Sequence, residues 1–136
     1  MNQMLRVVLD TNVLVSALIS DGKPRELFRK GIENQFLIVT SDPMLKELSH
    51  VLGRPKFKTN PDEIHRITLA LLNSAEVVNV KTKLRVVKED SKDDIVIETA
   101  YDGHADFIVT GDGHLLELES FKGIKIITVE KALKFL

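Results

Sequence analysis

The chain has 136 residues, of which 43% are hydrophobic and 29% are charged, and this balance predicts one globular domain over residues 1–136. It contains no cysteine, which excludes disulfides, thiolate zinc sites and a cysteine nucleophile, and its net charge of −1 excludes a globally basic nucleic-acid-binding surface. Its apolar runs fall short of the roughly 18 residues that a membrane-spanning helix needs, and its first residues lack a signal-peptide pattern. We therefore expect a cytoplasmic protein without membrane contact.

Apolar runs rich in β-branched residues are predicted as strands, and they alternate with amphipathic runs that are predicted as helices. The strands cover residues 5–9, 36–40, 76–80, 107–110 and 125–128. The helices cover about residues 11–20 (capped by Thr11 and Asn12), 25–33, 43–52 (capped by Asp42), 62–74, 93–103 and the C-terminus. This alternation predicts right-handed crossovers between parallel strands. The predicted fold class is α/β, a three-layer α/β/α sandwich with a central, mostly parallel sheet of about five strands.

Two of the predicted strands end in an aspartate, since Asp10 follows the first strand and Asp112 follows the fourth. The carboxyl ends of parallel strands lie at one edge of the sheet, where ligands of such folds bind, so we expect both carboxylates at that edge. Each aspartate alone would be better explained as a helix cap or a turn residue. Two of them at the same edge favour a functional site.

Two further acids lie on predicted helices. Glu47 lies on the shoulder of the apolar face of its helix, although an ordinary boundary glutamate would also fit there. Asp93 lies in the middle of the buried face of its helix, where a carboxylate needs a partner such as a metal ion. Its neighbour Asp94 has capping-box spacing from Ser91 and is interpreted chiefly as a capping residue.

Four carboxylates at one sheet edge repel one another, at a cost on the order of 4 kcal/mol for a pair about 4 Å apart at an effective dielectric of about 20. Divalent cations would neutralise this repulsion, and oxygen-only ligands suit Mg²⁺ or Mn²⁺ rather than zinc. Such ions activate water and stabilise the charge that develops in phosphodiester displacement. A metal-dependent hydrolase of phosphate esters is therefore predicted from four acids: Asp10, Glu47, Asp93 and Asp112.

Residues 8–14 resemble the opening motif of PIN-domain nucleases, with Asp10 as its acid. The other three acids of that family are matched, in order and over nearly the whole chain, by Glu47, Asp93 and Asp112. Any one of these motifs is weak, whereas the four in order are specific. Residues 51–57 are also similar to a stretch found in the VapC-like toxins of toxin–antitoxin pairs.

The resemblance implies a PIN-like fold and an Mg²⁺- or Mn²⁺-dependent endoribonuclease whose metal ligands are the four acids. It also implies that Thr11, Asn12 and Thr110 are supporting polar residues around the metal and the attacking water. Further implications are a homodimer and inhibition by an antitoxin that covers the site. One departure is His114, which stands where many family members have a further acid two residues after the fourth. The chain therefore lacks a fifth acidic ligand, which bears on whether it holds one ion or two.

Residues 54–58 combine three cations with an aromatic side chain, just after the helix of Glu47. Such a segment can bind phosphates and stack a base, so Arg54 and Lys56, together with Thr11, are candidate RNA contacts. A solvated loop at the rim of the domain explains the same residues equally well. The four histidines share no metal-ligand spacing and are interpreted as surface or structural residues.

Two other functions stay open. A haloacid-dehalogenase-like phosphohydrolase also has an aspartate after its first strand and a Gly-Asp-Gly segment, which would correspond to Asp10 and residues 111–113. Its general acid would fall on Asn12, however, and an amide cannot supply acid–base catalysis. A catalytically inactive PIN module that binds RNA or protein would keep the fold without cutting. A comparison of RNA survival with Mn²⁺ and with a chelator distinguishes this last function from a nuclease, because only a nuclease degrades more RNA when the metal is present.

Overall fold

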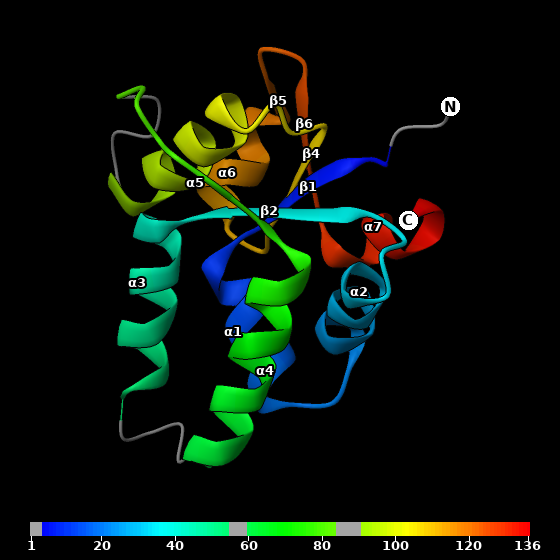
Figure 1. The fold of residues 1–136 in the computed structure, drawn as a ribbon. Helices are drawn as coiled ribbons and strands as arrows, with labels where there is room; N and C mark the ends of the chain where they lie inside the picture. Colours follow the sequence, from blue (N-terminus) through cyan, green and yellow to red (C-terminus); the bar gives the residue numbers. More distant parts are fainter. Residues whose placement is uncertain (1–3, 55–59, 84–90) are drawn as a thin grey trace.

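Strand β1 (Arg6–Leu9) lies at the centre of the sheet. Val7, Val8 and Leu9 are fully buried because both faces of the strand are covered. The strand pairs in parallel with β2 (Leu37–Ser41) on one side and with β4 (Phe107–Val109) on the other. The computed structural model describes residues 4–54, 60–83 and 91–136, and Figure 1 shows the arrangement of their helices and strands.

The sheet has six strands in the order β3-β2-β1-β4-β6-β5. The remaining strands are β3 (Glu76–Val78), β5 (Ser120–Phe121) and β6 (Ile124–Ile127). Every pairing is parallel except that of β5 with β6. The chain extends the sheet first on one side of β1 and then on the other, so the strand order switches between β1 and β4. In open parallel sheets, a switch of this kind opens a crevice at the carboxyl ends of the two strands.

Helices cover both faces of the sheet. One hydrophobic core contains residues of α1 (Thr11–Ile19), α2 (Lys23–Ile32), α3 (Asp42–Leu52), α4 (Pro61–Ser74) and α7 (Val129–Phe135). The other contains residues of α5 (Ser91–Asp102) and α6 (Gly113–Leu118). Side chains of β1 alternate between these cores, with Val7 and Leu9 in the first and Val8 in the second. In Figure 1, the strands pass between the two helical layers, which confirms the predicted α/β/α sandwich with a mostly parallel sheet.

Short elements and helix starts differ from the prediction. Strand β5 and helix α6 were not predicted, because two and six residues are too few to show a hydrophobic period. Asp42 is the first residue of α3 rather than its cap; the cap is Ser41, whose Oγ accepts a hydrogen bond from the Met44 N–H at 3.5 Å. Likewise, the cap position of α1 is Asp10, because β1 ends directly before it.

Some predictions fall where the structure gives no description. Lys56, a candidate RNA contact, lies outside the described residues, and so does the predicted capping side chain of Ser91. Among the helices of the described ranges, none combines the length and the apolar character needed to cross a membrane.

Candidate active site

Asp10 is held at the carboxyl end of β1 by the neighbouring strand. Its backbone N–H donates to the Val109 carbonyl of β4 at 3.0 Å, which extends the parallel pairing one residue past the strand. Thr110 Oγ1 donates to Asp10 Oδ2 at 2.6 Å, and both residues are buried. The Asp10 side chain makes no capping hydrogen bond to α1. The capping alternative therefore explains the backbone position of Asp10, while Thr110 engages its carboxylate.

Asp112 is tied to the same threonine and to the start of α6. Its backbone N–H donates to Thr110 Oγ1 at 3.0 Å. Its Oδ1 accepts hydrogen bonds from the backbone N–H groups of His114 at 2.7 Å and Leu115 at 3.2 Å, so Asp112 caps the helix. Both capping bonds use Oδ1, which leaves the second carboxylate oxygen out of the cap. Thr110 links the two aspartates and is thus a positioning residue for both.

The four predicted acids line one pocket of about 440 Å³. Asp10 and Asp112 reach it from the ends of β1 and β4, Glu47 reaches it from α3, and Asp93 reaches it from the first turn of α5. Asp10 and Asp93 are only 5% and 6% exposed, whereas Glu47 and Asp112 are half-buried. The pocket thus lies at the switch in strand order, where the sheet topology places a ligand site. The structure also brings three other predicted site residues to this pocket: Thr11, Asn12 and Arg54.

Apolar side chains complete the wall of the pocket. They come from α1, α3 and α5 and are Val15, Ile19, Met44, Val51, Ile95 and Val96. An apolar wall lowers the local dielectric, so the repulsion between the carboxylates and their attraction to a cation both grow. Arg54 is exposed and brings a positive charge to this acidic pocket. An arginine in such a place can bind a phosphate through two parallel hydrogen bonds.

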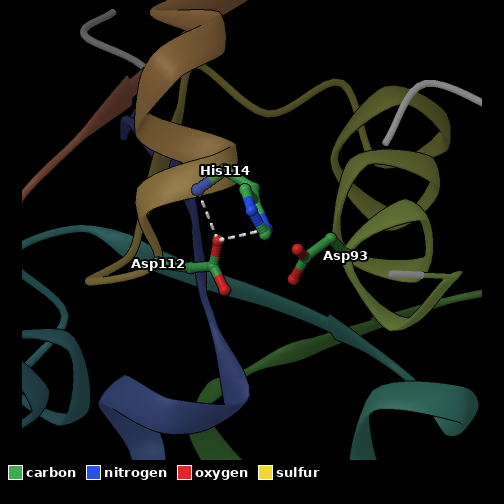
Figure 2. A group of neighbouring side chains, drawn as sticks. All are labelled: Asp93, Asp112 and His114. Atoms are coloured by element: carbon green, nitrogen blue, oxygen red, sulfur yellow. Dashed lines mark hydrogen bonds and ion pairs between the residues drawn. The ribbon is translucent and has the colours of Figure 1, made fainter. Parts of the chain in front are cut away.

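His114 lies beside this site, although no ligand role was predicted for it. One potential ligand atom from each of Asp93, Asp112 and His114 lies within 4.8 Å of the others. Figure 2 shows the imidazole ring next to Asp112, with the Asp93 carboxylate facing both from α5. The sequence signal for this placement was the position of His114 two residues after Asp112. A residue at that position lies in the first turn of the helix that the aspartate caps.

The chemistry of this donor set fits a divalent cation. Carboxylate oxygens suit Mg²⁺ and Mn²⁺, and an imidazole nitrogen is compatible with Mn²⁺ and later transition ions. The closeness of three potential ligand atoms in one place satisfies the first requirement of a metal site.

Comparison with known proteins identifies the family. A family model described as "PIN domain" matches residues 6–114, a range that contains all four acids and His114. The chain belongs to the PIN domain family. This PIN domain is 33% identical to "Uncharacterized protein MJ1680" of Methanocaldococcus jannaschii over 118 residues, which are 84% of the chain and 75% of that protein.

Two solved structures share the fold of this PIN domain. VapBC2 from Rickettsia felis, in a crystal structure with a DNA fragment from their promoter, matches with a TM-score of 0.65 and 18% identity over 91% of this chain and 98% of that chain. PAE2754 from Pyrobaculum aerophilum matches with a TM-score of 0.63 and 18% identity over 96% of this chain and 88% of that chain. At this identity the similarity shows a common fold. The predicted PIN-family membership is confirmed, and it favours the nuclease interpretation over the haloacid-dehalogenase-like one.

Proposed function

We propose that this PIN domain is a divalent-metal-dependent endoribonuclease that hydrolyses phosphodiester bonds in RNA. One observation carries the proposal: acids from four separate segments line one pocket at the switch in strand order. Burying carboxylates together costs free energy, so a fold that does so gains from a bound cation. Phosphodiester hydrolysis is the reaction that such a cation serves best, because negative charge builds up on the phosphate in the transition state.

The proposed metal ligands are Asp10, Glu47, Asp93 and Asp112, with Mg²⁺ or Mn²⁺ as the ion. When bound, the ion supplies Lewis-acid stabilisation of the phosphate and lowers the pKa of a water molecule. In the reaction, water attacks phosphorus, the bond from phosphorus to the leaving oxygen breaks, and that oxygen departs with a proton. The protein side chains hold the reacting groups in place for this exchange.

Three polar residues support the acids in this proposal. The hydrogen bond from Thr110 Oγ1 keeps the Asp10 carboxylate in one orientation. Asn12 is exposed at the pocket, so its amide can bind the attacking water or a phosphate oxygen. Arg54 carries the positive charge needed to draw the RNA backbone toward an acidic pocket, and we assign it a phosphate contact.

The proposal is tested by incubating the purified chain with structured and single-stranded RNA, with Mn²⁺, Mg²⁺ or a chelator. We expect fragments with the metal ions and intact RNA with the chelator. Asp10→Asn should be inactive, whereas the matched control Asp106→Asn, on an exposed residue outside the pocket, should cleave like the wild type. Equal survival of RNA with Mn²⁺ and with chelator, at high protein concentration, would contradict the proposal and favour the inactive RNA- or protein-binding module.

We further propose that the chain is the toxin of a toxin–antitoxin pair. The shared fold with VapBC2 and the resemblance of residues 51–57 to VapC-like toxins support this role. The antitoxin that the resemblance implies covers the acidic pocket, where the RNA would bind. Co-expression with the product of a neighbouring short reading frame should therefore suppress RNA cleavage. Cleavage that continues unchanged would contradict this role.

A homodimer is the last part of the proposal. The pocket of about 660 Å³ between α3 and α4 is lined by both apolar and polar side chains, and Leu72 among them is 42% exposed. Leu69, on the same helix, is 46% exposed. We propose that a second copy covers this surface, since exposed apolar patches commonly mark an interface. Sedimentation equilibrium should show a dimer for the wild type and a monomer for Leu72→Glu; a wild-type monomer at high concentration would contradict it.

A further inference from the structure

The imidazole of His114 lies where a ligand to a cation between Asp93 and Asp112 would lie. His114 is in the first turn of α6, its side chain is 52% exposed, and its Nδ1 is 4.0 Å from Asp112 Oδ1. Potential ligand atoms of the three residues lie within 4.8 Å of one another. Two atoms bound to one ion at about 2.1 Å each are at most about 4.2 Å apart. The exposed ring can close this small difference by rotating about its side-chain bonds.

A backbone hydrogen bond fixes the position of His114 relative to Asp112. The His114 N–H donates to Asp112 Oδ1 at 2.7 Å, so the histidine and the carboxylate are tied together at the start of α6. Asp93 approaches from α5, which packs with α6 in the same hydrophobic core. In Figure 2, the ring and the two carboxylates lie around one point. The simpler explanation, an ion pair of His114 with Asp112, uses only one of these two carboxylates.

We propose that His114 supplies an imidazole nitrogen to the metal ion of the active site, so the site prefers Mn²⁺ and later transition ions to Mg²⁺. The inference rests on the metal site of the proposed function and extends it to the choice of ion. Magnesium strongly favours oxygen ligands and retains its water, whereas imidazole suits borderline ions increasingly from Mn²⁺ toward Ni²⁺. A carboxylate in place of His114 would instead favour the hard Mg²⁺ ion.

Pulsed electron paramagnetic resonance on the Mn²⁺-loaded full chain tests the nitrogen ligand directly. We expect a nitrogen hyperfine coupling typical of imidazole in the wild type, its loss in His114→Ala, and its retention in His104→Ala. His104 is a matched control because it is an exposed histidine between α5 and β4, outside the acidic pocket and the proposed dimer surface. If His114→Ala fails to fold, His114→Asp serves in its place because it also removes the imidazole, and a wild-type spectrum without a nitrogen coupling overturns the inference.

Calorimetric titration with Mn²⁺ and Mg²⁺ tests the selectivity. His114→Ala should weaken Mn²⁺ binding by about 10- to 100-fold, as loss of groups around metal sites commonly does, and change Mg²⁺ binding much less. His114→Asp should reverse the preference toward Mg²⁺. Mn²⁺ binding without a nitrogen coupling would overturn this inference and leave the proposed nuclease intact. Absence of Mn²⁺ binding to the wild type would overturn both.

Discussion

The two edges of the parallel sheet use carboxylates in opposite ways. At the amino edge of the sheet, where the parallel strands begin, Arg6 forms an ion pair with Glu76. The Nε atom of Arg6 donates to the Gly103 carbonyl at 2.8 Å. The backbone N–H of Arg6 donates to Asp106 Oδ2 at 2.8 Å. One guanidinium thus joins the beginnings of β1 and β3 to the segment before β4. At the carboxyl edge, three aspartates and a glutamate line a common pocket.

This difference separates a structural from a chemical use of the same residue type. Glu76, which faces an arginine, and Asp106, which accepts a backbone N–H, both gain hydrogen bonds from the protein itself. Carboxylates that converge on one pocket repel one another, and the proposed cation would offset this repulsion. Substitutions at the amino edge should therefore cost stability, while substitutions at the carboxyl edge should cost activity and metal binding.

The largest expected effect is on cleavage at the carboxyl edge. Asp10→Asn should lower the rate of RNA cleavage by on the order of 10³-fold, because it removes a charged group that acts on the transition state. The free energy of unfolding without metal should stay equal or rise, because a repulsion is relieved while the amide oxygen can still accept the Thr110 hydrogen bond. Initial cleavage rates and urea denaturation measure the two effects. A variant that unfolds without metal would count against the comparison.

Metal binding should stabilise the fold through the carboxyl edge alone. At a free metal concentration of one hundred times the dissociation constant, an ion that binds only the folded state adds about 2.7 kcal/mol to the free energy of unfolding. Asp93→Asn should lose most of this gain, and Asp106→Asn should keep it in full. Urea denaturation of each protein with Mn²⁺ and with a chelator measures the gain. An equal gain in both variants would place the bound ion outside the pocket.

The amino edge should respond in the reverse manner. Arg6→Met keeps the apolar stem but removes the guanidinium from Glu76 and Gly103. We expect a loss of about 2 kcal/mol in the free energy of unfolding, since hydrogen bonds of charged groups contribute about 1.5–3 kcal/mol and this side chain is partly exposed. Cleavage by the folded variant should stay at the wild-type rate. A variant with normal stability and impaired cleavage would show that the two edges are not independent.

The carboxyl edge could be predicted from the sequence because its signals are local. Asp10 and Asp112 directly follow apolar strands, and Asp93 interrupts the apolar face of a helix. Parallel topology then brings these positions together without knowledge of any contact. The sequence alone could not tell that Thr110 links the two strand-end aspartates, because its hydrogen bond to Asp10 joins residues 100 positions apart.

The amino edge could not be predicted for the same reason. The partners of Arg6 lie 70, 97 and 100 residues away and belong to two other segments, β3 and the residues between α5 and β4. Nothing in the pattern around Arg6 distinguishes it from an ordinary surface arginine. The closeness of His114 to Asp93 and Asp112 could not be predicted for a different reason. It depends on the capped turn of α6, and a six-residue helix leaves too weak a pattern to place its side chains.

The smallest expected effect concerns Asp102, which joins the end of α5 to the segment after β3. Its Oδ2 accepts the backbone N–H groups of Lys81 at 2.8 Å and Thr82 at 2.9 Å, and its Oδ1 accepts the Thr82 hydroxyl at 2.6 Å. These bonds, first the Thr82 hydroxyl and then the backbone groups, lower the pKa of Asp102 below its ordinary value of 3.8. A carboxyl with a lowered folded-state pKa adds stability above its unfolded pKa, and this stability is lost as the pH falls through the folded value.

Asp102→Asn should therefore cost no more than about 1 kcal/mol at pH 7, because solvent screens this partly exposed group. The difference in free energy of unfolding between wild type and variant should stay constant above about pH 5 and shrink as the pH falls below about 4, where the wild-type carboxyl becomes protonated. Urea denaturation of both proteins across this range measures it, and the acids of the pocket cancel because both chains contain them. A difference that grows toward acid pH would mean that Asp102 is held in its protonated form, which would contradict the prediction.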